Sequence, residues 1–270
     1  MAEVKTQKDL DFERKHEEDL RRIRDFRLMD DSFMNKVFED KPCAEFLLQI
    51  ILNRNDLKVK EVHGQHPLNN IQGRSVRLDI LAVDHENRAY NIEIQRSDHG
   101  AGAKRARYNS SVLDANLTDP GDAYDTLNET YVIFITENDV LRGGLPIYHI
   151  NRIIEETGKS FGDEAHIIYV NSQIKDDTAL GKLMHDFTCT NPDDMNYSVL
   201  AQRVRYFKED MTGVATMCRA FEEVREETKR EQAIESAKTM LADGLPYEQI
   251  ARYTKLSVEE VKALDDKKSA

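Results

Sequence analysis

The spacing of hydrophobic positions predicts helices at both ends of the chain and strands in its middle. Residues 8–30 and 31–52 carry apolar residues at roughly helical spacing, and the second region is interrupted near Pro42. Between residues 76 and 95 the period changes to two and β-branched residues become frequent, which indicates strands. Further segments of these two kinds are strands at 131–136 and 166–170 and helices at about 101–116, 176–187 and 197–240. Strands and helices mixed in this way predict one α/β unit.

Residues 76–95 have the pattern of a β-hairpin. Its first strand, polar loop and second strand are VRLDILAV (76–83), DHENR (84–88) and AYNIEIQ (89–95). If the loop is symmetric about Glu86, Asp79 lies directly opposite Glu93. Gln95, two residues further along the second strand, shares the face of Glu93. The hairpin therefore brings two carboxylates and an amide together.

The C-terminal part of the chain predicts three short helices. Residues 231–242 carry one apolar face, Gly244 would end that helix, and Pro246 suits the first turn of the next. Ser257 and Glu260 form an S-x-x-E capping box that would open a third helix. Three short helices joined by tight turns are typical of a helix-turn-helix.

We therefore expect a main domain over residues 1–224 and a helical, helix-turn-helix-like segment over 225–270. The helix at 258–264 would read the major groove in such a motif, but it carries both acids and bases. Docking on a neighbour or dimerisation is the alternative role for this segment.

Composition and charge narrow the class of protein. Of the 270 residues, 40% are hydrophobic and 33% charged, which indicates a globular protein without a membrane span. The N-terminus has no apolar signal core, so we expect a cytoplasmic location. Three distant cysteines, Cys43, Cys189 and Cys218, predict neither a disulfide framework nor a thiolate zinc site. A net charge of −12 argues against broad nonspecific binding of nucleic acid, so any DNA contact must be local.

Asp79 and Glu93 are the candidate catalytic residues. Carboxylates that face one another across a hairpin repel, and apolar neighbours increase the cost of their charge. A divalent cation offsets this cost, because Mg²⁺ (or Mn²⁺) binds through one or two carboxylates and keeps positions for water and phosphate oxygens. Phosphodiester hydrolysis uses such a cation to polarise the phosphoryl group and activate a water. From the pattern alone, a pair of acids on a solvent-facing strand surface is the alternative.

Other segments accompany the hairpin in a fixed order. They are DSFMNKVF (31–38), KRARY (104–108), YVIFITENDV (131–140) and LPIYHI (145–150). Together with the hairpin, over about residues 29–264, they resemble the PD-(D/E)XK nuclease superfamily and specifically its recombination-promoting nuclease or putative transposase family. The resemblance implies a restriction-endonuclease-like core, a mixed β-sheet flanked by helices. It also implies a metal-dependent DNA endonuclease that hydrolyses phosphodiester bonds in recombination or mobile-element processes.

The resemblance assigns roles to single residues. Asp79 and Glu93 would bind the catalytic metal, and Gln95 would occupy the place of the water-orienting lysine. A glutamine can hold a water or a phosphate oxygen by hydrogen bonds, but it supplies neither charge nor a base. Glu45, on the helix ahead of the sheet, is a candidate for the additional helix acid of such nucleases.

A basic stretch follows the second hairpin strand. Lys104, Arg105, Arg107 and Tyr108 lie on the helix predicted there, where they could bind DNA phosphates beside the metal. The alternative is a basic surface turn with Tyr108 packed into the core. We expect DNA as the partner and no membrane association, and self-association into a homo-oligomer remains open.

Two other functions share this fold. One is a catalytically weak or inactive DNA-binding or regulatory protein, for which Gln95 in the lysine position is the main support. The other is a host-defence nuclease, which has the same chemistry and differs in its biology.

Overall fold

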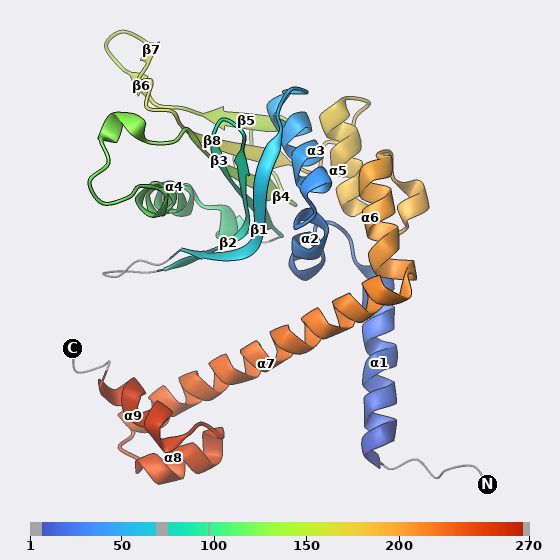
Figure 1. Ribbon diagram of the computed structural model, residues 1–270, viewed down its shortest axis with the longest axis vertical. Coiled ribbons are helices and arrows are strands. Elements are labelled where there is room, and N and C mark those ends of the chain that lie inside the picture. The colour runs from blue at the N-terminus through green and yellow to red at the C-terminus, as the bar shows by residue number, and fades with distance from the viewer. Residues whose placement is uncertain (1–6, 69–74, 97, 267–270) are drawn as a thin grey trace. The chain divides into compact units, whose positions relative to one another are not determined.

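The computed structural model describes residues 7–68, 75–96 and 98–266, and its centre is a six-stranded mixed sheet (Figure 1). The strand order is β1-β2-β3-β4-β8-β5. The strands β3, β4 and β8 are parallel, and the other neighbours pair antiparallel. Their bounds are β1 Val59–Leu68, β2 Val76–Asp84, β3 Ala89–Gln95, β4 Thr130–Thr136, β5 Ile147–Ile150 and β8 Ala165–Asn171. A separate small hairpin pairs β6 (Ile153–Ile154) with β7 (Lys159–Ser160).

The sequence predicts four of these strands, β2, β3, β4 and β8, and misses β1 and β5. The strand β1 lies at an edge of the sheet, and its residues alternate between exposed and partly buried. Its sequence, VKEVHGQHPL, is too polar to show the alternation clearly. Pro67 is tolerated near its end because an edge strand does not need every N–H for the ladder.

Helices cover both faces of the sheet. The helices α2 (Asp31–Phe38), α3 (Lys41–Leu52), α5 (Ala179–Thr188) and α6 (Ser198–Glu209) lie on one side, and α4 (Ala103–Leu117) lies on the other (Figure 1). Aromatic contacts join the first group: Phe38 stacks on Phe187 of α5 with ring centroids 5.7 Å apart, and Phe33 meets Phe207 of α6 edge-on at 6.1 Å. This is the predicted mixed sheet flanked by helices.

The region predicted at 197–240 is divided by a capping residue, whereas no side-chain cap bond marks the starts of α2 and α3. The N-terminal region gives α1 (Gln7–Asp25), then α2, and then α3 with Pro42 in its first turn. The region expected to be continuous over 197–240 breaks at Asp210, between α6 and α7 (Met211–Ala242). The Asp210 carboxylate accepts hydrogen bonds from Thr212 N–H at 2.8 Å and Gly213 N–H at 3.1 Å. Aspartate is a strong N-cap, so a new helix begins where the periodicity alone shows no boundary.

The loop between β2 and β3 fixes the register of the central hairpin. The buried Asp84 carboxylate accepts hydrogen bonds from the backbone N–H groups of Glu86 and Arg88, both at 2.9 Å. Its second oxygen lies 2.7 Å from both Arg88 Nε and the Tyr90 hydroxyl. Asn87 supplies the left-handed backbone position of the turn, with φ of 60°. One acid therefore holds both ends of the loop, and the strands cannot slip past one another.

The C-terminal unit, Cys218–Ala270, contains the predicted three helices. They are the end of α7, α8 (Tyr247–Thr254) and α9 (Val258–Asp266), and the residues at the centre of their core are Ala237, Ile250, Leu256 and Val261. Gly244, with φ of 77°, makes the first turn. The capping box forms as predicted: Ser257 N–H donates to Glu260 Oε2 at 2.8 Å, and Glu260 N–H donates to Ser257 Oγ at 3.1 Å. Pro246 precedes α8 as its N-cap instead of entering its first turn.

The chain divides into compact units at Met1–Met217 and Cys218–Ala270, and the division falls within α7. The predicted boundary, 224/225, lies in the same helix. None of the helices in the described part of the chain is long and apolar enough to span a membrane.

Candidate active site

The central hairpin places Asp79 and Glu93 beside one another. The ladder between β2 and β3 follows the predicted register and ends with Ile80 opposite Ile92, so the next residues of the two strands are Asp79 and Glu93. Here the Asp79 side chain enters the ladder, and its Oδ2 accepts a hydrogen bond from Ile94 N–H at 3.2 Å. The carboxylate oxygen accepts from a strand N–H, as a backbone carbonyl would, so the sheet holds this side chain in place.

Glu93 lies under the N-terminal end of α4. It pairs with Phe134 of β4, which packs against Ala106 of α4. The Glu93 side chain is fully buried, and its Oε2 lies 2.8 Å from Nη2 of Arg105. Its Oε1 is also buried and makes no hydrogen bond of normal geometry among the described residues, although the Asn91 side chain lies near enough to lower the pKa of this acid. A buried carboxylate oxygen without a donor is costly, and a bound cation would satisfy it.

Both acids resist ionisation. Burial raises the pKa of Glu93, and the negative charge of Asp79 raises it further, while the Arg105 guanidinium opposes the shift. Burial also raises the pKa of Asp79, against the hydrogen bond from Ile94, and the charge of Asp31 adds to the rise. Carboxyl groups with raised pKa values in close proximity are characteristic of functional sites.

Two further residues belong to this centre, and sequence reasoning missed both. Asp31, the first residue of α2, interacts electrostatically with Asp79 and Arg105, and although part of its surface is exposed, desolvation raises its own pKa. Gln65 of β1 has a left-handed backbone, with φ of 47°, and it lies opposite Asp79 in the register of β1 and β2, where its side chain lowers the pKa of that acid. A non-glycine residue held in this conformation often marks a functional site, but only the fold reveals it.

Gln95 is partly buried at the end of β3, and its side chain lies against Gly100. A Cβ atom on Gly100 would come within 1.7 Å of Gln95 Oε1 and 3.5 Å of Arg105 Nη1. The Gly100 carbonyl also accepts a hydrogen bond from Arg105 Nη1 at 2.9 Å. A side chain at position 100 would therefore displace the end of the Gln95 side chain, while its distance to Arg105 would be an ordinary contact.

Glu45 lies away from this centre. Its Oε2 accepts a hydrogen bond from Val59 N–H at 3.0 Å, and its Oε1 lies 2.8 Å from Lys58 Nζ. Val59 pairs with Asp84, at the loop end of the hairpin, which is about 16 Å from Asp79 along the strand. Glu45 therefore anchors the start of β1, and Asp31 is the helix residue that supplies an acid to the site.

The four residues expected to bind DNA occupy different environments on α4. Arg105 contacts Glu93, as described above. Lys104 and Arg107 are exposed to solvent. Tyr108 is partly buried and packs against the core cluster that contains Leu78. Lys104, Arg105 and Arg107 are thus all accessible to solvent, and Arg105 differs in its contact with Glu93.

Charges near α2 form a paired network. Arg96 Nη1 lies 2.9 Å from Asp30 Oδ1, and Arg96 Nε lies 3.4 Å from Glu137 Oε2. Arg27 contacts the same acid, with Nη1 3.0 Å from Glu137 Oε1. These bases are already matched by acids, so the region contributes less net positive charge than α4 does.

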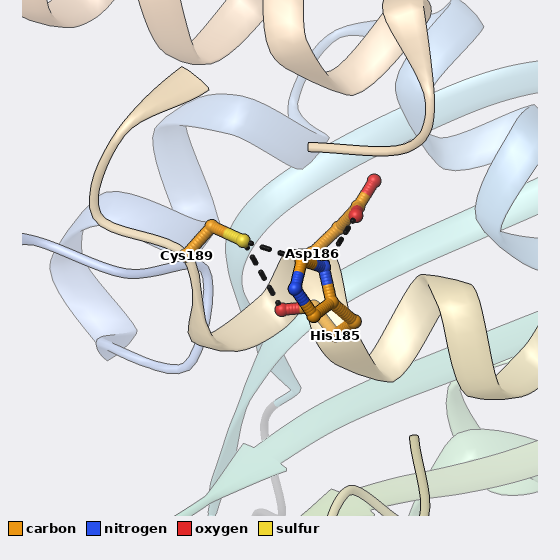
Figure 2. Close-up of side chains that lie close together, drawn as sticks. All are labelled: His185, Asp186 and Cys189. Atoms are coloured by element: carbon orange, nitrogen blue, oxygen red, sulfur yellow. Dashed lines mark hydrogen bonds and ion pairs between the residues drawn. The ribbon is translucent and has the colours of Figure 1, made fainter. Parts of the chain in front are cut away.

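A second cluster of ligand-type side chains lies at the end of α5. Atoms of His185, Asp186 and Cys189 lie within 4.8 Å of one another (Figure 2). The Asp186 carboxylate already accepts hydrogen bonds from Asn196 N–H at 2.7 Å and Tyr197 N–H at 2.9 Å. Burial and the charge of Asp186 raise the pKa of Cys189 to about 11. This group therefore caps the following loop, and its thiol is poorly suited to bind a metal as a thiolate.

The donors at the hairpin suit a hard cation better. They are carboxylate oxygens, which Mg²⁺ and Mn²⁺ prefer, and one of them is buried without a partner. In the described part of the chain, the ligand atoms of His185, Asp186 and Cys189 lie within 4.8 Å of one another. The carboxylates of Asp31, Asp79 and Glu93 do not form a group that close. A cation held by Asp79 and Glu93 would thus keep other positions for water and phosphate.

Comparison with known proteins gives one match. A family model described as PD-(D/E)XK nuclease family transposase matches residues 32–191. This range contains Gln65, Asp79, Glu93, Gln95 and Arg105, and it begins one residue after Asp31. No curated protein and no solved structure matches the chain.

Proposed function

The chain belongs to the PD-(D/E)XK nuclease family transposases, and we propose that it is a metal-dependent DNA endonuclease that hydrolyses phosphodiester bonds. In this proposal Asp79 and Glu93 hold a Mg²⁺ or Mn²⁺ ion. The observation that supports it best is the Glu93 side chain, which is fully buried with one oxygen lacking any hydrogen bond among the described residues. Most buried polar atoms in proteins have a partner, and a bound cation would supply one to this oxygen.

Each residue of the site would have a definite part. Asp79 is held by the Ile94 N–H, so it presents its carboxylate in one orientation, and Gln65 restrains it from the neighbouring strand. Gln95, at the end of β3, would orient the attacking water or a phosphate oxygen by hydrogen bonds. When bound, the cation would polarise the phosphoryl group and lower the pKa of that water.

DNA would approach along α4. Lys104 and Arg107 are exposed on the first turns of this helix, beside the end where Arg105 reaches Glu93. The overall charge of −12 means that such a local basic surface would have to hold the phosphates. Recombination or mobile-element DNA is the substrate context that we propose from the family.

A plasmid-nicking assay tests the proposal. The natural protein is compared with Asp79→Asn and Glu93→Gln in Mg²⁺ and in Mn²⁺, because both substitutions keep the side-chain shape and remove the charge. We expect nicking by the natural protein and a loss of at least about a hundred-fold in each variant.

Glu45→Gln is the matched control, because it makes the same change at an acid bound to Val59 N–H and Lys58. It should nick DNA as the natural protein does. Nicking that persists in both site variants, or no nicking by any of the proteins with either metal, would overturn the assignment.

A catalytically weak or inactive DNA-binding protein is the second candidate, and Gln95 supports it. The residue lies where the PD-(D/E)XK superfamily motif has a lysine, which glutamine commonly replaces in the family that this chain resembles, and an amide cannot stabilise charge on a phosphate as an ammonium group does. DNA binding without nicking, unchanged in Asp79→Asn, would favour this candidate.

A further inference from the structure

We propose that Arg105 is the charge-compensating residue of the active site: it holds Glu93 before a cation binds, and it then supplies to the phosphate the positive charge that Gln95 lacks. This inference rests on the proposed nuclease function. It gives Arg105 a role distinct from that of the exposed bases Lys104 and Arg107.

The contacts of Arg105 support the first part. Its Nη2 lies 2.8 Å from Glu93 Oε2 and its Nη1 donates to the Gly100 carbonyl at 2.9 Å, so the guanidinium is held at two points. The Arg105 side chain is 41% exposed, whereas Glu93 is fully buried. The base therefore reaches inward from the surface, and it can return to solvent at much lower cost than the acid could.

Glu93 needs a positively charged partner because of its position. Asp79 lies beside it and repels its charge, so an unpaired Glu93 anion would be strongly disfavoured. Arg105 is the cation that the structure places against this acid. Two cations beside one carboxylate repel each other, so a metal bound there would weaken the hold of Arg105 on Glu93.

The position of Gln95 supports the second part. Gln95 Oε1 and Arg105 Nη1 lie on the same side of Gly100, at 1.7 Å and 3.5 Å from the position that a Cβ atom would take there. A phosphate oxygen held by the Gln95 amide would therefore be near the guanidinium. Arginine is well suited to this task, because its planar fork matches phosphate oxygens and it stays charged at any relevant pH.

The test measures metal binding and catalysis separately in the full-length protein. Mn²⁺ binding is measured by calorimetry without DNA at pH 8.5, and nicking rates are measured over a range of DNA concentrations at saturating Mn²⁺. The variants are Arg105→Gln, Arg105→Lys and, as the matched control on the same helix, Arg107→Gln.

We expect Arg105→Gln to bind Mn²⁺ about five-fold more tightly, because a competing positive charge is gone. Its kcat should fall about a hundred-fold with little change in KM for DNA. Arg105→Lys should recover part of kcat, since it keeps the charge and loses the fork. Arg107→Gln should leave Mn²⁺ affinity unchanged and raise KM, as expected for a phosphate contact.

Unchanged or weaker Mn²⁺ binding by Arg105→Gln would overturn the inference. A nicking rate of this variant that returns to the natural value at high DNA concentration would also overturn it. Arg105→Lys guards against loss of the fold, because a variant that binds Mn²⁺ stoichiometrically is folded at the site. If the natural protein neither binds Mn²⁺ nor nicks DNA, the proposed function fails. If it does both and Arg105→Gln behaves like Arg107→Gln, the inference alone fails.

Discussion

Replacing Glu93 by glutamine should stabilise the metal-free protein at neutral pH while it abolishes cleavage. The Glu93 side chain is fully buried beside Asp79, and the folded state disfavours its charge in spite of Arg105. An acid whose pKa is raised by folding keeps its proton where the unfolded chain has already released it. The folded protein therefore loses stability as the pH rises from the unfolded pKa, near 4, through the raised pKa of the folded state. Glutamine has a similar shape without the charge, so the variant avoids this loss.

The size of the effect follows from the pair of acids. Each unit by which folding raises a pKa costs about 1.4 kcal/mol of stability once the pH exceeds the raised value. Folding raises the pKa of Glu93 from 4.5 to about 7, which gives roughly 3 kcal/mol, or about 6–12 °C in Tm for a folded domain of this size. Some of this gain is lost because Arg105 gives up its partner, but that side chain is 41% exposed and water can replace the carboxylate. We therefore expect a net increase in Tm of about 5 °C at pH 8.

Thermal unfolding in EDTA at pH 5 and pH 8 measures this effect. At pH 5 Glu93 is largely protonated in the folded protein, so the natural protein and Glu93→Gln should differ little. His66, whose pKa burial lowers, makes the folded protein more stable as the pH rises through the histidine range, but it does so equally in both proteins and cancels. Glu45→Gln should show no gain at either pH, because its carboxylate accepts from Val59 N–H and pairs with Lys58. A Tm difference that does not grow between pH 5 and pH 8 would refute this account of Glu93.

Three further predictions concern other parts of the chain. Gly100→Ala should lower the nicking rate at least ten-fold without changing the fold seen by circular dichroism, because its Cβ would displace Gln95 Oε1; an unchanged rate would show that Gln95 has no part in the reaction. The double variant Lys104→Gln, Arg107→Gln should reduce the slope of log Kd for DNA against log salt concentration by about 1.8, as two lost phosphate contacts require, and an unchanged slope would place the DNA elsewhere. Ser257→Ala should destabilise the C-terminal unit by about 1 kcal/mol, since it removes the acceptor of Glu260 N–H; hydrogen exchange of the α9 amides measures this, and equal protection in both proteins would contradict it.

The hairpin could be predicted from sequence because its information is local. The alternation of β2 and β3 defines the strands, and Asp84 closes the loop within five residues of sequence, so the register needs no distant contact. The capping box at Ser257 is local in the same way. Such features can be derived from one chain without knowing its fold.

Residues that reach the site from distant segments could not be predicted in this way. Asp31 begins a helix well before the hairpin in sequence, and Gln65 lies on an edge strand whose polar residues hide its period. Glu45 was the reasonable choice of helix acid by chemistry, but α3 runs so that this residue meets the opposite end of β1. The packing of α2 and α3 on the sheet decides which helix places an acid near Asp79. That packing cannot be predicted from the residue pattern of the two helices.

Gln95 illustrates why the site needs both kinds of evidence. As a departure from the lysine of the superfamily motif it suggests a weakened enzyme, because an amide carries no charge. The structure adds that Gly100 brings Arg105 beside the same space and that Arg105 is already engaged with the buried metal-ligand candidate Glu93. The positive charge that the hairpin motif lacks is therefore present nearby, on a helix that follows the second strand. A lysine at position 95 would add a second cation beside Arg105 and would compete with both it and the metal for the same carboxylates. The glutamine is thus consistent with a site whose charge balance has moved from β3 to α4, and the metal-binding measurement on Arg105→Gln distinguishes that arrangement from a site that has lost its chemistry.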